Sequence, residues 1–327
     1  MISEQTYSYL VSWLCPAMEA EYKRLYSKGK DGGKLRGLGK YDKNVYQGRV
    51  DRLRSIVRNL ICEDKMKRFL SDGSKSAIYA FNGVCFVRVE DREIFLKEFI
   101  KRAFIELDLG EKYNDEYPAK AIAMSCLDTI SSSDKYLYRP NRRYVAFRNL
   151  VYDVEKRKAV KPSVEQCPAI VLDLEYKDKD ELYRECGNKY GIMDNPCKLW
   201  DTKIAEIIPN KDARSVFQQW CGALIADKSQ FKLEYCLFLL GPGANGKSVV
   251  SNVIASVFGK EYFSCFSFRQ LFKDSDRNVN IAALANKVAN FIDDMDGKEL
   301  SGGDFKRFAS GGEFQGRVPY DKKPVKV

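Results

Sequence analysis

Histidine is absent from this chain of 327 residues, and its absence excludes several kinds of active site. Without an imidazole base, a serine or cysteine nucleophile cannot be activated as it is in the common hydrolase triads. A zinc site with histidine ligands cannot form, and a nuclease that relies on a histidine general base is excluded as well. Any chemistry must therefore use carboxylate, amine, guanidinium, hydroxyl or thiol groups.

Paired cysteine motifs are missing too. The ten cysteines stand singly along the chain, and no two have the CxxC spacing that is typical of metal or redox motifs. Cys186 and Cys197, the nearest neighbours in the sequence, could supply only half of a metal site. Scattered cysteines of this kind favour a reducing compartment such as the cytoplasm.

Long hydrophobic runs are also lacking. No stretch approaches the roughly 18 consecutive apolar residues that a membrane-spanning helix needs. The N-terminal sequence lacks the basic start and the unbroken apolar segment of a secretory signal. We therefore expect no membrane association and no export.

What the chain does have is a globular composition with a basic excess. Hydrophobic residues make up 45% and aromatic residues 13%, more than a disordered chain contains. The net charge of +10 suits a polyanionic partner such as nucleic acid, although many soluble proteins are equally basic. The length is that of two or three domains.

The first 230 residues predict a helical region with small β-hairpins. Residues 1–44 are expected to form a helix, broken near Pro16, and a basic glycine-rich linker over 23–43. That linker either holds nucleic acid through its phosphates or is simply solvated, and the second reading is slightly favoured. Residues 45–230 predict amphipathic helices, with hairpins at 77–89 and 144–155.

Residues 241–248 carry the strongest functional signal. Their sequence, GPGANGKS, follows an apolar run predicted as a strand over 237–240 and precedes an apolar-periodic stretch predicted as a helix up to Gly259. Glycines let successive backbone N–H groups point at an anion, and the helix N-terminus adds its positive end. The alternative is a chance match in a glycine turn. The predicted nucleotide-binding residues are Gly241, Pro242, Gly243, Ala244, Asn245, Gly246, Lys247 and Ser248.

Specific roles follow for the last residues of this motif and for an acidic pair. Lys247 would reach the β- and γ-phosphates of ATP, and the Ser248 hydroxyl would bind Mg²⁺. An apolar segment over 288–292 predicts a short buried strand that ends in Asp293 and Asp294. One acid would contact the Mg²⁺ and the other would polarise the attacking water. Asp293 is assigned to the metal, although the choice between the two stays open, and aspartate is also common at the end of a strand.

The C-terminal residues add a basic segment. Two helix-like turns are followed by a glycine-rich stretch and a predicted hairpin. The candidate DNA contacts in this segment are Lys306, Arg317, Lys322 and Lys323.

These features together resemble superfamily-3 helicases of the phage, plasmid and poxvirus primase-helicase type. The family P-loop reads GxGxNGKS, and its acidic motif is followed by a lysine-then-glycine segment similar to Lys306 with Gly311 and Gly312. The stretches AFNGVCFVRVED, YVAFRNLVYDVEKRKAV and WCGALIADK also look like the family's N-terminal region. The resemblance covers about residues 60–327. It implies an α+β helical N-terminal domain with small β-hairpins, followed over 231–327 by an α/β AAA+-like P-loop ATPase domain.

The functional implication is an ATP-dependent DNA helicase of phage or plasmid replication in the cytoplasm of a bacterial host. Its cofactors would be ATP and Mg²⁺, and its partners would be single-stranded or forked DNA, further copies in a hexameric ring, and a primase or other replication proteins. Two departures stand out. An Asp-Asp pair replaces the glutamate-containing pair of many members, and the family's sensor strand and arginine finger would lie beyond Val327, so we expect a fragment of a longer protein.

Two other readings remain. The first is a non-catalytic DNA-binding or adaptor protein related to the helicase. The second is a small-molecule kinase, which is disfavoured because such kinases usually begin near their P-loop, whereas 240 residues precede this one.

Overall fold

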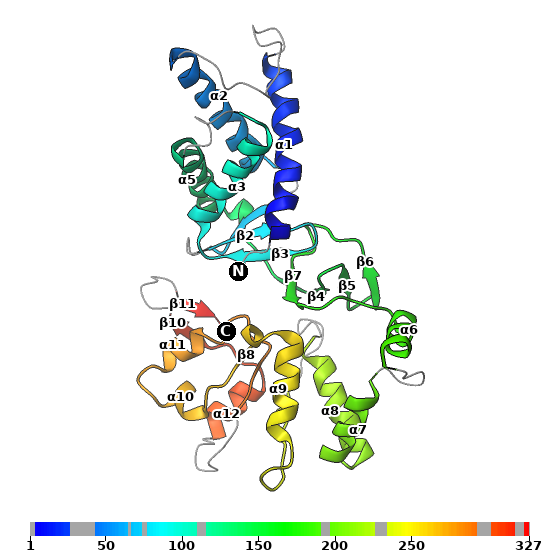
Figure 1. Cartoon of the computed structure of the whole chain (residues 1–327). Coiled ribbons are helices and arrows are strands. Elements are labelled where there is room, and N and C mark those ends of the chain that lie inside the picture. The colour runs from blue at the N-terminus through cyan, green and yellow to red at the C-terminus, as the bar shows by residue number, and fades with distance from the viewer. Residues whose placement is uncertain are drawn as a thin grey trace. The chain divides into compact units, whose positions relative to one another are not determined.

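The computed structural model divides the chain into two compact units (Figure 1). The first comprises Met1–Pro140 and Pro162–Cys167, and the second comprises Asn141–Lys161 and Pro168–Val327. Both units mix helices with small sheets, so the expected α+β character is confirmed. The structure describes residues 4–26, 43–64, 67–73, 77–109, 116–190, 197–225, 234–292, 302–317 and 324–326.

Helices dominate the first unit. The amphipathic pattern of α3 buries Phe95, Leu96, Phe99, Ile100, Ala103 and Phe104, as its i, i+4 spacing predicts. This face packs against α5 and α1, and α2 packs against α5 in the same core. The helices are α1 (Glu4–Tyr26), α2 (Lys43–Cys62), α3 (Arg92–Glu106), α5 (Glu116–Ser132) and the 3₁₀ turn η1 (Asp134–Tyr136).

Helix α1 continues through Pro16, so the predicted break there is wrong. Proline removes one backbone donor and disfavours a helix interior, but packing can outweigh this local penalty. Leu14, Cys15 and Met18 are buried around the proline, and the Cys15 thiol donates to the carbonyl of Ala103 on α3. The helix is therefore held by the core that it helps to build.

The sheet of the first unit is antiparallel, with β1 (Phe69–Ser71), β2 (Ile78–Phe81) and β3 (Phe86–Val89) in the order β1-β2-β3. The hairpin predicted over 77–89 is confirmed. Gly83 has φ +98°, and the Asn82 side-chain oxygen accepts from the N–H groups of Val84 and Cys85.

The second unit begins with a four-stranded sheet in the order β6-β5-β4-β7, and β4 and β7 are parallel. The hairpin predicted over 144–155 is confirmed as β4 and β5. Arg143 on β4 binds the buried carboxylate of Asp153 on β5 at 2.8 Å, which joins the two strands through their side chains. The strands are β4 (Asn141–Ala146), β5 (Val151–Asp153), β6 (Lys158–Val160) and β7 (Pro168–Val171).

The rest of the second unit is built from helices and very short strands. One core joins Phe217 of α8, Val250 and Ile254 of α9, Phe263 of β8 and Val288. The helices are α6 (Lys179–Tyr190), α7 (Lys198–Ile207), α8 (Lys211–Ala223), α9 (Lys247–Phe258), the 3₁₀ turn η2 (Lys260–Tyr262), α10 (Phe268–Phe272), α11 (Arg277–Ala282) and α12 (Gly302–Ala309). The strands are β8 (Phe263–Ser264), β9 (Ala289–Asn290), β10 (Gln315–Arg317) and β11 (Pro324–Lys326).

The compact units do not follow the boundaries predicted at residues 44 and 230. Helices α1 and α2 lie in one core with α3 and α5, and the division of the chain falls at Pro140. The predicted linker lies largely outside the described residues, because α1 extends to Tyr26 and α2 starts at Lys43. No helix in the described part of the chain has the length and apolar character to cross a bilayer.

Candidate nucleotide-binding loop

Residues 241–248 form a tight turn that leads directly into α9. Gly246 has φ +86° and is the cap residue of the helix, while Ala244, two residues earlier, has φ +59°. Left-handed residues of this kind turn neighbouring N–H groups towards one side of the loop. The N–H groups of the first helical turn have no intrahelical acceptor, so they add to the same donor-rich end.

Space is limited at two glycines of the loop, and at Gly246 the left-handed backbone also favours glycine. A Cβ on Gly246 would lie 2.8 Å from the side chain of Ile207 at the end of α7. A Cβ on Gly241 would lie 2.1 Å from the amide nitrogen of Asn245. By contrast, a Cβ on Gly243 would meet nothing within 4 Å. The loop is therefore closed at its two ends and open at its middle.

The loop holds its own lysine. The Lys247 ammonium donates to the backbone carbonyls of Gly241 and Pro242, each at 3.0 Å, and to the Asn245 side-chain oxygen at 2.7 Å. The positive charge therefore stands within the curl of the loop. An anion that enters the open middle would meet this charge and the N-terminus of α9 together.

Helix α9 is anchored to the core along one stripe. Val250, Ile254 and Phe258 are buried at i, i+4 and i+8, and Gly259, with φ +98°, ends the helix where the sequence predicts. Ser248, the second residue of the helix, is exposed. Its hydroxyl is therefore accessible beside the loop.

The segment before the loop differs from the prediction. Residues 234–242 form neither a helix nor a strand, so the strand predicted over 237–240 is wrong. Leu237 and Leu239 pack partly against the core of the second unit, whereas Tyr235, Phe238 and Leu240 are 77%, 49% and 90% exposed. The side chains alternate as in a strand, but no described strand pairs with this backbone. Pairing, and not the apolar pattern, decides whether such a segment becomes part of a sheet.

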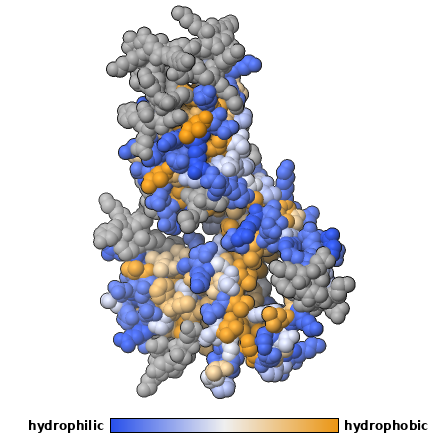
Figure 2. All heavy atoms as spheres, in the orientation of Figure 1, coloured by the Kyte–Doolittle hydropathy of each residue, from blue (hydrophilic) through white to orange (hydrophobic). Residues whose placement is uncertain are grey.

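Apolar side chains also reach the surface on α9 itself. Val249 and Val257 of this helix are exposed. Both residues lie away from the buried stripe of the helix. Figure 2 shows apolar residues gathered on one face of the second unit. The loop is thus flanked by apolar surface on the helix that follows it and on the segment that precedes it.

The region expected to supply the acidic pair is only partly described. Strand β9 is two residues long and pairs in parallel with β8. The side chain of Asn290 accepts from Ser264 Oγ at 2.7 Å and from the Phe266 N–H at 2.9 Å, and it donates to the Phe266 carbonyl at 2.8 Å. Phe291 stacks on Phe263 in the core that α9 shares. Asp293 and Asp294 follow directly but lie outside the described residues.

Two of the four candidate DNA contacts, Lys306 and Arg317, lie in the described part of the chain. Lys306 is exposed on α12, whose Phe305 and Phe308 pack against Phe268 of α10. Arg317 is exposed at the end of β10, and the predicted hairpin is confirmed as β10 and β11. Lys322 and Lys323 lie outside the described residues.

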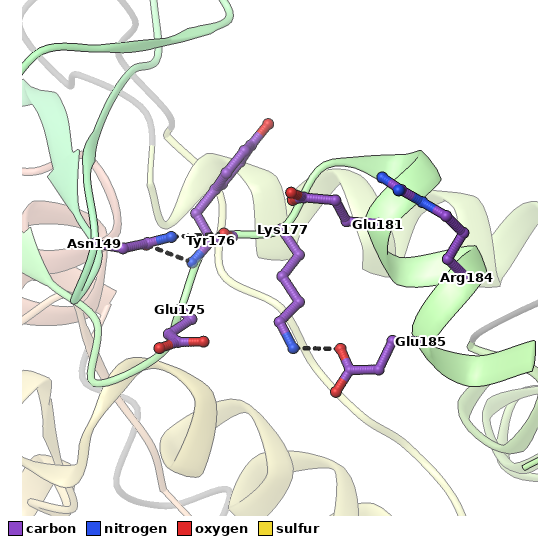
Figure 3. Close-up of a pocket in the computed structure, with 7 residues that line it drawn as sticks. All are labelled: Asn149, Glu175, Tyr176, Lys177, Glu181, Arg184 and Glu185. Carbon is purple, nitrogen blue, oxygen red and sulfur yellow. Dashed lines mark hydrogen bonds and ion pairs between the residues drawn. The ribbon is translucent and has the colours of Figure 1, made fainter. Parts of the chain in front are cut away.

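A shallow hollow of about 700 Å³ lies elsewhere in the second unit, between the segment after β7 and α6 (Figure 3). Lys177 forms an ion pair with Glu185 there, and Asn149 makes two hydrogen bonds to the backbone of Tyr176. Three glutamates face one lysine and one arginine, so this surface is unfavourable for a polyphosphate. Its lining residues are Asn149, Glu175, Tyr176, Lys177, Glu181, Arg184 and Glu185.

Among the described residues, those that could hold ATP with Mg²⁺ belong to the loop over 241–248. No group of three metal-ligating histidine, cysteine or carboxylate side chains occurs in the described residues. Mg²⁺ bound with a nucleotide usually takes only one or two protein ligands, together with phosphate oxygens and water, so no such group is required. The exposed Ser248 hydroxyl beside a donor-rich loop fits this arrangement.

Two contacts of the site were not predicted. The sequence indicates Asn245 only as a residue of the loop, yet its side chain binds Lys247 and closes against Gly241. Ile207, from α7, limits the space at Gly246. The first contact follows from the short spacing between Asn245 and Lys247, whereas nothing in the local sequence links Ile207 to the loop.

In the comparisons with known proteins, no protein-family model and no curated protein matches this chain.

Proposed function

We propose that this chain binds ATP with Mg²⁺ at residues 241–248 and belongs to an ATP-dependent DNA helicase of the superfamily-3 type. The observation that carries the proposal is the loop geometry. A left-handed Gly246 caps an apolar-anchored helix, and the loop curls around the ammonium of Lys247. A donor-rich loop with a lysine at a helix N-terminus is an arrangement that proteins use for phosphate groups.

Each residue of the loop has a distinct role in this proposal. The backbone N–H groups of the loop and of the first turn of α9 bind the phosphate oxygens. Lys247 leaves its three loop acceptors and neutralises charge on the β- and γ-phosphates. Ser248 contributes its hydroxyl to the Mg²⁺ ion, which offsets phosphate charge when bound. One acid of the pair, Asp293 by assignment, contacts the Mg²⁺ ion, and the other, Asp294, polarises the attacking water.

The DNA side of the proposal rests on charge. The chain carries a net charge of +10, and Lys306 and Arg317 are exposed on neighbouring segments after β9. Such contacts bind the phosphate backbone without reading sequence, which suits a motor that moves along single-stranded or forked DNA. Assembly into a hexameric ring, association with replication proteins and a bacterial cytoplasmic setting complete the proposal.

A DNA-binding adaptor without ATPase activity is the second candidate. It is favoured by one observation, namely that residues 234–242 stand outside any described sheet. In P-loop enzymes the segment before the loop is a strand, which fixes the loop against the sheet. Among the described residues, the support for this segment comes from Leu237 and Leu239, which pack against the core of the second unit.

Calorimetry with ATP and Mg²⁺ tests the proposal. The wild-type chain should bind, and Lys247→Ala should remove detectable binding because it deletes the charge at the centre of the loop. The matched control is Lys260→Ala, which removes an exposed lysine just beyond α9. Equal affinity in wild type and Lys247→Ala would refute the nucleotide site. DNA binding without any ATP binding would instead support the adaptor.

A further inference from the structure

The turn between α7 and α8 meets the nucleotide-binding loop, although it comes from an earlier part of the sequence. The Ile207 side chain, at the last residue of α7, lies 2.8 Å from the position of a Cβ on Gly246, the residue that caps α9. The helices that follow this contact also share a core, in which Phe217 of α8 lies with Val250 of α9 (Figure 1). The start of α8 and the start of α9 therefore belong to the same end of this helix pair.

The first turn of α8 places a cation at this end. Arg214 is half-buried, whereas the three residues before it in α8 are exposed. It lies three residues before the buried Phe217, so both side chains occupy the side of α8 that faces the core shared with α9. Arg214 Nη1 donates to the carbonyls of Ile208 and Pro209, each at 2.7 Å. The guanidinium is thus held at the end of α7, next to the residue that contacts the loop.

These contacts leave part of the guanidinium available. Within the described residues, no carboxylate pairs with Arg214, and its Nε and Nη2 groups donate to no protein atom. An arginine can close the end of a helix by donating to its last carbonyls, and Nη1 alone does so here. The N–H groups on Nε and Nη2 form the edge of the guanidinium that can bind an anion through two hydrogen bonds.

The charges around this end of α9 favour an anion. Lys247 and Arg214 are both cationic, and the N-terminus of α9 adds its positive end. Asp212, the neighbouring acid on α8, is exposed and lies two residues from Arg214, so the two side chains do not face each other on the helix. A phosphate group outside the loop would therefore meet a positive charge on the α8 side as well as on the loop side.

We propose that Arg214 binds the terminal phosphate of the ATP held by residues 241–248. The proposal rests on the proposed nucleotide site and adds to it a residue from outside the loop. The backbone of a P-loop surrounds the inner phosphates, whereas the terminal phosphate projects from it and carries the largest charge. Arg214 keeps Nη1 on the carbonyls at the end of α7 and directs Nε and Nη2 to two oxygens of that phosphate.

This contact makes Arg214 a determinant of nucleotide selectivity. ADP has no terminal phosphate, so it binds through the loop and Lys247 without Arg214. ATP gains the additional charge-assisted hydrogen bonds. The chain should therefore prefer ATP to ADP, and most of that preference should depend on Arg214.

The test compares the binding of ATP and of ADP, each with Mg²⁺, to the full chain by calorimetry. Arg214→Gln removes the charge but keeps an amide donor for the carbonyls at the end of α7. It should weaken ATP binding about tenfold and change ADP affinity by less than about twofold. Arg214→Lys, which keeps the charge, should recover part of the loss. The matched control is Arg277→Gln, which removes an exposed arginine at the start of α11 and should bind both nucleotides as wild type does.

The comparison of the two nucleotides separates a phosphate contact from a purely structural role. An equal loss for ATP and ADP in Arg214→Gln would mean that Arg214 only closes the end of α7, and it would overturn the proposal. Circular dichroism checks that each variant folds. If Arg214→Gln does not fold, Arg214→Lys decides the question, because its preference for ATP over ADP should lie about threefold below that of wild type.

Failure of this proposal is distinguishable from failure of the nucleotide site. Unchanged ATP affinity in Arg214→Gln, together with lost binding in Lys247→Ala, would refute the role of Arg214 and leave the site in place. A wild-type chain that binds neither nucleotide would refute both.

Discussion

The Lys247 ammonium lies 2.7 Å from the Asn245 side-chain oxygen, and Asn245 in turn stands against Gly241. Asn245 therefore holds the lysine and closes the first turn of the loop at the same time. We expect Asn245→Ala to weaken ATP binding about tenfold, because the lysine loses the group that positions it. Asn245→Asp should weaken binding further, since a carboxylate both retains the lysine and repels phosphate. Calorimetry measures both, and unchanged affinity in Asn245→Ala would contradict the positioning role.

Gly246 and Gly243 give a matched pair of stability variants. An added methyl group would be crowded at Gly246 and would meet open space at Gly243. Gly246→Ala should lower the free energy of unfolding by about 1–3 kcal/mol, because φ +86° is unfavourable for alanine and the new methyl group would press on Ile207. Gly243→Ala adds a methyl group to open space, so its effect should stay within about 0.5 kcal/mol. Urea denaturation compares them. A larger loss for Gly243→Ala would mean that the loop is packed differently.

The buried Asp153 predicts a pH-dependent contribution to stability. Hydrogen bonds from Arg143 are the main cause that lowers the pKa of Asp153, so its folded-state pKa lies below its unfolded value of about 3.9. The contribution is then complete above pH 4 and is lost as the pH falls through the folded pKa. Asp153→Asn should cost about 1–3 kcal/mol at pH 7, and the difference from wild type should shrink in acid.

Asp173 supplies the control for this pH experiment. It also pairs with an arginine, Arg148, but its side chain is 90% exposed. Solvent screens such a pair, so Asp173→Asn should leave the free energy of unfolding nearly unchanged. Urea denaturation at several pH values measures both variants. A difference for Asp153→Asn that persists undiminished below pH 3 would show that packing, and not charge, explains its effect.

DNA binding should be insensitive to sequence and steeply dependent on salt. Lys306→Ala and Arg317→Ala should each weaken single-stranded DNA binding and reduce the slope of log K against log salt by about 0.7, because each removes one phosphate contact. Fluorescence anisotropy across a salt series measures the slope. Lys198→Ala, an exposed lysine on α7, is the control. A flat salt response would argue against phosphate binding by this chain.

The sequence predicted helices and turns correctly where the residues that determine them lie close together in the sequence. The spacing of Phe95, Phe99 and Ile100 identified the buried face of α3, and Asn82 with Gly83 identified the turn between β2 and β3. The P-loop motif likewise predicted α9 and its end at Gly259. In each case the residues that fix the structure are neighbours in the sequence.

Predictions were wrong or incomplete where residues far apart in the sequence determine whether an element forms. Whether residues 237–240 become a strand depends on a pairing partner that the local sequence does not contain. Helix α1 continues through Pro16 because α3, which lies far along the sequence, packs against it.

The route of the chain between its two units affects how the protein can be cut. The polypeptide leaves the first unit after Pro140, returns at Pro162 and leaves again after Cys167. Val164, in the returning segment, is buried in the core of the first unit. A single protease cut at any one of these passages would leave the units joined by the other two, and a truncation at Pro140 would remove Val164 from that core. Under native conditions, an N-terminal fragment should therefore separate from the rest only after more than one cleavage.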